Sequence, residues 1–126
     1  MTAVVYDAGV LVAADRNVRT VWAEHKVWLE AGVVPAVPAA VVTQVSRSPV
    51  QAQLRRLLRG CEIVPLTEQR AHAAGQLLGR AGSADVVDAT VAQLAAELRA
   101  DVVTGDQADI RRLLDMTDSP GRIIGL

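Results

Sequence analysis

Ala3-Val4-Val5-Tyr6-Asp7 near one end of the chain and Asp101-Val102-Val103-Thr104-Gly105-Asp106 near the other decide the predicted fold. Each stretch is a short apolar run that ends at an aspartate, as expected of a strand buried on both faces of a parallel sheet. A stretch with helical spacing follows each run. The chain therefore alternates between strands and helices, which is the pattern of an α/β protein.

The rest of the chain continues this alternation, with Gly and Pro at several of the breaks. Apolar runs predict strands at residues 3–6, 33–37, 61–66, 101–104 and 122–124. Helical spacing predicts helices at residues 9–15, 19–31, 39–47, 51–59, 67–79, 84–99 and 107–114. Pro38 is expected to open the helix at residues 39–47, because proline fits the start of a helix, and Ser83 is expected at the N-cap of residues 84–99. We expect a three-layer α/β/α sandwich, whose mostly parallel central sheet has about five strands, in one domain over residues 1–126.

The charge is spread unevenly along a chain whose formal net charge is only −1. Residues 47–80 carry 6 basic and 2 acidic groups, net +4, and residues 81–126 carry 4 basic and 8 acidic groups, net −4. A basic middle beside an acidic end suits a cation site next to a surface for a polyanion. Ordinary scatter of surface charge explains the same pattern equally well.

Cysteine content and hydropathy indicate the compartment. Cys61 is the only cysteine, so no intrachain disulfide and no cysteine-based zinc site can form, in agreement with a reducing cytoplasm. The N-terminus lacks the pattern of a signal peptide. The longest apolar run, residues 31–42, contains Pro35 and Pro38 and is too short to span a bilayer. We expect a cytoplasmic protein without a membrane segment.

Aspartates gather where an open α/β sheet binds its ligands, outside the carboxyl ends of the strands. Asp7 follows the first predicted strand and Asp106 the fourth, while Asp88 borders the buried stripe of helix 84–99. Asp85 and Asp109 lie three residues from Asp88 and Asp106, on the same helix sides. Carboxylates brought together repel one another unless a divalent ion neutralises them, and a site made of oxygen ligands favours Mg²⁺ or Mn²⁺ over zinc.

Helix capping is the alternative interpretation of most of these aspartates. Asp7 and Asp106 each precede a predicted helix, where an N-cap aspartate needs no catalytic role. Asp85, in a first helical turn, is explained at least as well by helix stability. Asp88 is expected in the second turn, too deep to cap. It therefore carries most of the argument for a metal site.

Other chemistry finds little support in the chain. No P-loop, dinucleotide-binding or nucleophile-elbow motif is present. His25 and His72 lie on separate predicted helices without metal-ligand spacing, so each is expected to be a surface or packing residue. Trp22 and Trp28 fit a partner surface, core packing or a dimer contact.

Three of these segments together resemble the PIN-domain family. They are Val4-Val5-Tyr6-Asp7-Ala8, Asp88-Ala89-Thr90-Val91-Ala92 and Val103-Thr104-Gly105-Asp106, and their order and spacing are most similar to the small VapC-like toxins of toxin–antitoxin pairs. The resemblance implies a Mg²⁺- or Mn²⁺-dependent endoribonuclease that cleaves RNA, is often dimeric and is often inhibited by a small antitoxin. It further implies that Asp7, Asp88 and Asp106 are metal ligands, with Asp85 and Asp109 as additional candidates and Thr104 supporting Asp106.

One position departs from the family pattern. Gln44 stands where the family usually has a glutamate, so one negative charge is lost. The Gln44 carbonyl can still ligate weakly or hold a metal-bound water, and Asp85 can compensate as an extra acid one helical turn before Asp88. A catalytically weak or inactive PIN-like module that binds RNA or protein is therefore the main alternative to a nuclease. A phosphorylated receiver-like signalling domain is disfavoured, because it normally needs a late lysine near the site, whereas Lys26, the only lysine, lies on an early predicted helix. Candidate RNA-steering side chains are Arg55, Arg56, Arg59, Arg111 and Arg112, although each also fits a solvated helix face.

Overall fold

The strands are short, and each is followed by a helix except the last. The structure is a computed structural model that describes residues 2–126. In chain order the elements are β1 (Val4–Tyr6), α1 (Ala8–Asp15), α2 (Arg19–Glu30), β2 (Ala36–Pro38), α3 (Ala39–Val45), α4 (Ala52–Arg59), β3 (Glu62–Val64), α5 (Glu68–Ala81), α6 (Val86–Leu98), β4 (Asp101–Thr104), α7 (Gln107–Leu114) and β5 (Ile123–Gly125).

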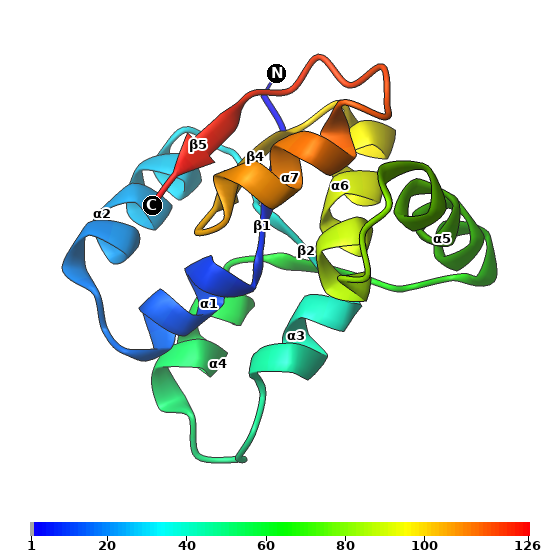
Figure 1. Ribbon diagram of the computed structural model, residues 1–126. Coiled ribbons are helices and arrows are strands. Elements are labelled where there is room, and N and C mark those ends of the chain that lie inside the picture. The colour runs from blue at the N-terminus through cyan, green and yellow to red at the C-terminus, as the bar shows by residue number, and fades with distance from the viewer. Residues whose placement is uncertain (1) are drawn as a thin grey trace.

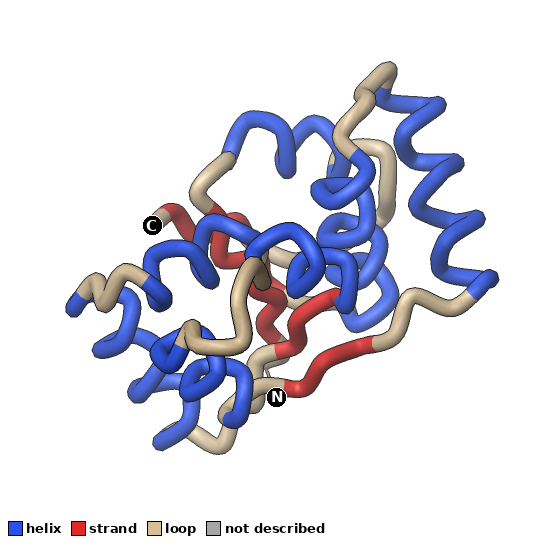
Figure 2. The backbone as a smooth tube through the Cα atoms, turned by 90° about the horizontal axis from the view of Figure 1, so that it is seen from below, coloured by secondary structure: helices blue, strands red, loops and turns tan. Residues whose placement is uncertain are grey.

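All five strands form one parallel sheet in the order β3-β2-β1-β4-β5. The predicted fold class is confirmed, since helices cover both faces of this sheet (Figures 1 and 2). The chain adds β2 and β3 on one side of β1 and then crosses to β4 on the other side. The connections therefore diverge between β1 and β4, which is the point where open α/β sheets place their ligand crevice.

Two groups of helices flank the sheet. On one face α1 contacts β1 and β4 and also packs against α2 and α4. On the other face α6 contacts β1, β2 and β4 and packs against α5 and α7. Helix α3 contacts both α1 and α6, so these three helices lie close together near the carboxyl end of β1 (Figure 1).

Helix α6 is the most deeply buried helix that contributes to the predicted site. Its buried positions are mostly small or branched residues, which lets the helix approach the sheet closely; they are Ala89, Thr90, Val91, Ala92, Leu94 and Ala95. The packing holds α6 firmly and thereby also the acidic residues at its N-terminus.

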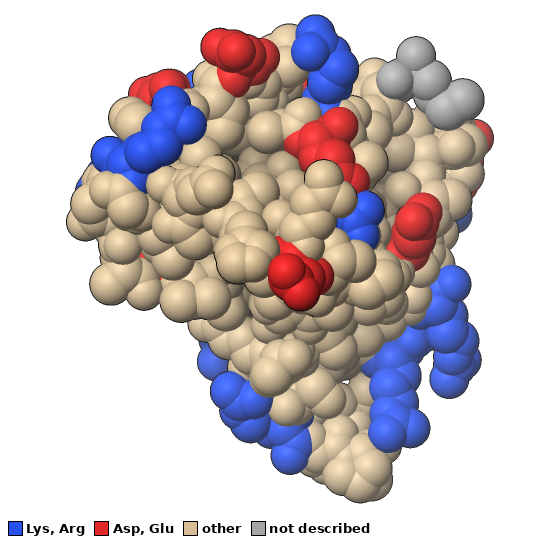
Figure 3. All heavy atoms as spheres, turned by 90° about the vertical axis from the view of Figure 1, so that its right-hand side faces the viewer, with Lys and Arg blue, Asp and Glu red and all other residues tan. Residues whose placement is uncertain are grey.

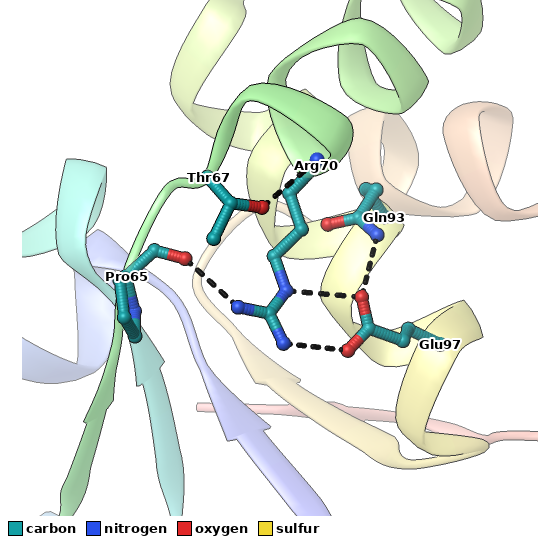
Figure 4. A network of polar contacts seen from close by, with 5 residues as sticks. All are labelled: Pro65, Thr67, Arg70, Gln93 and Glu97. Atoms are coloured by element: carbon teal, nitrogen blue, oxygen red, sulfur yellow. Dashed lines mark hydrogen bonds and ion pairs between the residues drawn. The ribbon is translucent and has the colours of Figure 1, made fainter.

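A network of polar contacts ties α6 to α5 (Figure 4). The Arg70 guanidinium donates to both carboxylate oxygens of Glu97, at 3.0 and 2.8 Å, and to the Pro65 carbonyl at 3.1 Å. Gln93 donates to the same Glu97 carboxylate at 3.1 Å. The two-pronged ion pair lowers the pKa of Glu97 and fixes the α5–α6 pair relative to the β3–α5 loop.

The predicted N-cap of α6 was wrong. Helix α6 begins at Val86 and its N-cap is Asp85, whose side chain accepts the Asp88 backbone N–H, whereas Ser83 lies outside the helix and accepts from Asp85 N at 3.3 Å. An aspartate carboxylate competes well with a serine hydroxyl for the N-cap. Pro38 ends β2, paired with Val64 of β3, and is also the N-cap of α3, so it opens this helix as predicted.

The aromatic side chains of α2 pack inward. His25 is buried and its Nδ1 lies 3.0 Å from the Tyr6 hydroxyl, which confirms the packing interpretation of this histidine. Trp22 Nε1 donates to the Ala14 carbonyl at 3.1 Å, and the Arg56 guanidinium stacks 4.0 Å above the Trp22 ring.

Among residues 2–126, no helix has the length and apolar character needed to cross a membrane.

Candidate metal centre

Asp7 is buried, with only 2% of its surface exposed, directly after β1. Its Oδ1 accepts the Val10 backbone N–H at 3.2 Å and so caps α1. Its Oδ2 accepts the Thr104 hydroxyl and the Gly105 backbone N–H, the latter at 3.2 Å. Burial raises the pKa of Asp7, while these hydrogen bonds act in the opposite direction. Capping is thus one role of Asp7, and its second oxygen faces β4.

Asp106 caps α7 on the other side of the divergence point. Its Oδ1 accepts the Asp109 backbone N–H at 3.4 Å, and its own backbone N–H donates to the Thr104 hydroxyl oxygen at 2.8 Å. The Thr104 hydroxyl therefore donates to Asp7 and accepts from Asp106, so one buried side chain links the carboxyl ends of β1 and β4.

Asp88 lies in the first turn of α6, not in the second as predicted. Its backbone N–H donates to Asp85 Oδ1 at 3.0 Å, and its carboxyl oxygen Oδ2 is buried with no hydrogen-bond partner. Burial and, after it, the neighbouring charges of Asp85, Asp106, Asp7 and Asp109 together raise the pKa of Asp88 to about 7.

Three of the five predicted acids come into direct proximity. Each of Asp88, Asp106 and Asp109 offers a carboxylate oxygen within 4.8 Å of the others. The charge of Asp7 acts on Asp88, but Asp7 does not belong to this group of three, since Thr104 and two backbone N–H groups hold its oxygens. The side chain of Asp106 is the main cause of a raised pKa at Asp109. The five acids thus belong to one neighbourhood built from β1, α6 and the β4–α7 turn.

These residues fit a hard divalent cation. The donors are carboxylate oxygens, which Mg²⁺ and Mn²⁺ prefer. Asp88 Oδ2 is buried without a hydrogen-bond partner, and a bound cation would satisfy it, because a buried carboxylate oxygen is costly without a cation or a donor. Coordination of a cation would also relieve the repulsion within the cluster.

Of the remaining predicted residues, only Arg112 is paired with an acid of this neighbourhood. Gln44 is exposed near the end of α3, the helix that contacts both α1 and α6. Arg112 pairs with Asp109 at 3.3 Å and is therefore part of the acidic neighbourhood. The other candidate arginines are exposed on α4 and α7, and they are Arg55, Arg56, Arg59 and Arg111. Figure 3 shows Lys and Arg side chains gathered at the lower end of the molecule, where Figure 1 places α3 and α4.

Two glycines that shape the site were not predicted from the sequence. A Cβ atom on Gly9 would lie 3.2 Å from Asp7 Oδ1 and 3.2 Å from the Gly105 nitrogen, so α1 packs tightly against the β4–α7 turn and a larger residue would have to displace these neighbours slightly. Gly105 supplies a backbone donor to Asp7. Each of these glycines lies close in sequence to an aspartate that follows a strand. That position is the signal that could have revealed the roles of both glycines.

Fold and site together define an α/β/α domain with a carboxylate cluster where the connections of its parallel sheet diverge. The PIN domain family model matches residues 4–113, and the chain belongs to the PIN domain family. The predicted resemblance is thereby confirmed.

Solved structures of similar fold include components of toxin–antitoxin systems. A chain in the structure of VapBC2 from Rickettsia felis, bound to a promoter DNA fragment, matches with a TM-score of 0.72 and 15% identity, covering 99% of both chains. A chain of a toxin–antitoxin complex from Klebsiella pneumoniae matches with a TM-score of 0.66 and 18% identity over 84% of this chain and 88% of the other. A chain of FitAB bound to the IR36 DNA fragment matches with a TM-score of 0.64 and 16% identity over 97% and 94%. No curated protein sequence matches the chain.

Proposed function

We propose that this PIN-domain protein is a Mg²⁺- or Mn²⁺-dependent endoribonuclease of the VapC-like toxin type. The observation that carries the proposal is the buried, partnerless Oδ2 of Asp88 beside the carboxylates of Asp106 and Asp109. Crowded acids of this kind are unfavourable in a metal-free protein and become favourable around a cation.

The proposed ligands are Asp7, Asp88 and Asp106, with Asp109 and Asp85 as additional acids. A bound divalent ion lowers the pKa of a water molecule and neutralises charge on a phosphodiester. The protein's own contribution is orientation: Thr104 holds Asp7 relative to Asp106, and the packing of α6 against the sheet holds Asp88. Such preorganisation supports hydrolysis, because the oxygens of Asp88, Asp106 and Asp109 already lie within 4.8 Å of one another.

RNA would approach through exposed arginines, which attract a phosphate backbone without reading its bases. Arg112 pairs with Asp109 on α7, Arg111 is exposed beside it in the chain, and Arg55 and Arg59 are exposed on α4. Arg56 contributes less in this proposal, because its guanidinium already stacks on Trp22.

A small antitoxin and a second copy of the chain are the proposed protein partners, and the cytoplasm is the proposed location. Support for the antitoxin comes from the structural neighbours, two of which are described as VapBC2 and as a toxin–antitoxin complex. A small reading frame beside the gene, encoding a DNA-binding protein that co-purifies with this chain, would support the antitoxin. Sedimentation of the purified chain tests the homodimer.

RNA cleavage in Mn²⁺ tests the enzyme directly. Wild type is expected to cleave a structured RNA pool, to stop when EDTA is added, and to lose at least about 100-fold in rate in Asp88→Asn, because one ligand charge is gone. Asp118→Asn, which removes an exposed acid from the turn after α7, serves as the charge-matched control and should cleave like wild type. Equal rates for wild type and Asp88→Asn would refute the proposed role of the cluster.

A non-catalytic PIN module that binds RNA or protein is the second candidate. Gln44 favours it, because a neutral amide stands on α3, the helix that contacts α1 and α6, and adds no charge to the site. Calorimetric titration with Mn²⁺ separates the two: an absence of binding supports the module. Gln44→Glu should increase cleavage if the protein is a nuclease weakened at this position, and should leave a pure binding module without activity.

A further inference from the structure

The α1–α2 turn and the α3–α4 loop are joined to each other at the C-terminal end of α1. The link is the side chain of Gln51, which uses both its oxygen and its nitrogen. Its Oε1 accepts the backbone N–H groups of Arg47 and Ser48 at 2.7 and 3.0 Å, and its Nε2 donates to Asp15 Oδ2 at 3.0 Å. The two segments are therefore held together and form one surface, which we call the loop surface.

Basic and aliphatic side chains are exposed together on the loop surface. Arg16 and Arg19 flank the α1–α2 turn, Arg47 belongs to the α3–α4 loop, and all three are exposed. Val18 lies between the first two arginines in the chain and is 40% exposed, while Val50 in the α3–α4 loop is 81% exposed. Figure 3 shows Lys and Arg side chains at this lower end of the molecule. A partner that fits the loop surface needs both negative charge and apolar groups.

Helix stability does not explain the residues at the start of α2. Val18 is the N-cap and makes no side-chain cap hydrogen bond, although Ser, Thr, Asp and Asn are the residues that stabilise this position. Arg19 adds a positive charge to the first turn, where the helix dipole favours a negative one. Residues that break local rules without a structural gain are expected at functional surfaces.

Arg47 is held in place and still has donors to offer. Its Nη1 donates to the Thr43 and Ser46 carbonyls at 2.8 and 3.0 Å, near the end of α3. A guanidinium has five N–H groups, so Nε and Nη2 can still donate to a carboxylate. The one acid between these segments, Asp15, already accepts from Gln51. The loop surface therefore carries an excess of positive charge.

We propose that the loop surface binds an acidic segment of a partner protein, whose carboxylates pair with Arg16, Arg19 and Arg47 and whose aliphatic side chains cover Val18 and Val50. Arginine suits this role because its planar fork matches a carboxylate. RNA also carries negative charge, but it has no aliphatic side chains with which to cover exposed valines.

The loop surface is separate from the candidate metal centre. Asp7 caps the N-terminus of α1, whereas Arg16 is the C-cap at the other end of this eight-residue helix. A helix of that length spans about 12 Å. The inference therefore does not depend on the proposed nuclease activity, and it stands or falls on binding alone.

Fluorescence anisotropy in EDTA tests the inference with two labelled probes, a peptide of alternating glutamate and leucine and a single-stranded RNA oligonucleotide. Arg19→Glu should weaken peptide binding about tenfold because a charge is reversed, while the Tm stays equal or rises because glutamate suits the first turn of α2. Val50→Ser should weaken peptide binding about threefold and leave RNA binding unchanged. Arg80→Glu, which reverses an exposed charge on α5, is the matched control and should bind the peptide like wild type.

Several results would overturn the inference. Wild type that does not bind the peptide, or a control variant weakened as much as Arg19→Glu, would show that the loop surface has no specific affinity for an acidic segment. Weaker RNA binding by Arg19→Glu with unchanged peptide binding would assign the surface to RNA. Equal peptide binding by wild type and Val50→Ser would mean that charge alone attracts the peptide, which removes the reason for choosing a protein partner.

Discussion

Asp88 is the residue at which the folded structure opposes ionisation most clearly. Burial and the nearby carboxylates raise its pKa to about 7 from an ordinary 3.8. An acid whose pKa is higher in the folded state costs nothing below its unfolded pKa, where both states hold the proton. The cost grows as pH rises through the interval between the two values and is complete above about 7.

Asp88→Asn should therefore stabilise the metal-free protein at high pH. In EDTA at pH 8 its Tm should exceed that of wild type by about 3–8 °C, and the difference should disappear near pH 4. Melting curves by circular dichroism across this pH range provide the measurement, with Asp118→Asn as the charge-matched control. A variant less stable than wild type at pH 8 would show that Asp88 is stabilised by contacts rather than strained by charge.

Thr104 is the second residue whose contacts decide the geometry. It is completely buried, and its hydroxyl bonds both to the Asp7 carboxylate and to the Asp106 backbone. A valine has nearly the same shape but would leave these two groups without their partner. The loss falls on Asp7, which is itself buried.

Thr104→Val should lower the free energy of unfolding by about 1–3 kcal/mol, because the buried Asp7 carboxylate loses a hydrogen bond. Thr104→Ser keeps the hydroxyl and should cost only about 1 kcal/mol for the missing methyl group. Urea denaturation of both variants measures the difference. A serine variant as unstable as the valine variant would assign the effect to packing and not to the hydroxyl.

At the scale of elements, three helix starts build the candidate site. Asp7 caps α1, Asp85 caps α6 and Asp106 caps α7, so each helix places a carboxylate at its own N-terminus. Capping and metal binding are alternative interpretations of the sequence, and the geometry allows both together. Each of these carboxylates accepts a backbone N–H through one oxygen, which fixes the direction of the other oxygen.

Gly9 and Gly75 test how closely α1 approaches the site. Both glycines are helical, but a Cβ on Gly75 of α5 would meet nothing within 4 Å, whereas one on Gly9 would press against Asp7 and Gly105. Gly75→Ala should stabilise the protein by about 0.5–1 kcal/mol, as expected for alanine in an exposed helix. Gly9→Ala should destabilise it by about 1 kcal/mol, since the gain in helix propensity is smaller than the cost of the close contact.

Urea denaturation of the two alanine variants gives the comparison, and Mn²⁺ titration of Gly9→Ala adds a readout at the site. Stabilisation by Gly9→Ala of the same size as that by Gly75→Ala would mean that the contact between α1 and the β4–α7 turn is loose.

On the scale of the whole molecule, the sheet order brings together acids that are distant in sequence. Because β4 pairs directly with β1, Asp7 and Asp106 follow neighbouring strands. Asp7 accepts a hydrogen bond from the Gly105 backbone N–H, although Gly105 lies 98 positions later in the chain. Helix α6 covers both strands and contributes Asp88. Folding therefore concentrates negative charge, and a cation that binds the folded state alone should stabilise it.

Mn²⁺ should raise the Tm of wild type, and the rise should increase with the free Mn²⁺ concentration relative to Kd. At a free concentration of about 100 times Kd, a ligand of the native state contributes about 2.7 kcal/mol. Asp88→Asn should show a much smaller rise. NaCl at matched ionic strength is the control, because screening alone also relieves repulsion between carboxylates. An equal rise in NaCl and in Mn²⁺ would indicate screening without a specific site.

Local patterns are sufficient to predict the elements. Buried strands appear as apolar runs and helices as helical spacing, so the number, order and type of the elements, and the parallel sheet, follow from the amino-acid sequence alone. Boundaries are less certain where two residues compete locally. Ser83 and Asp85 are both good N-caps, and the outcome depends on which side chain reaches the Asp88 N–H once α6 packs on the sheet.

By itself, the sequence determined the α/β class, the family and the set of aspartates at the strand ends, because these follow from periodicity and from residue identity at short range. The tertiary structure alone decided which of those acids meet. Carboxylate oxygens of Asp88, Asp106 and Asp109 lie within 4.8 Å of one another, while Asp7 lies outside this group and its Oδ2 accepts the Thr104 hydroxyl. The physical reason is that burial, hydrogen-bond partners and electrostatic repulsion depend on distances between residues far apart in the chain. Those distances exist only after the strands have paired and α6 has packed against them.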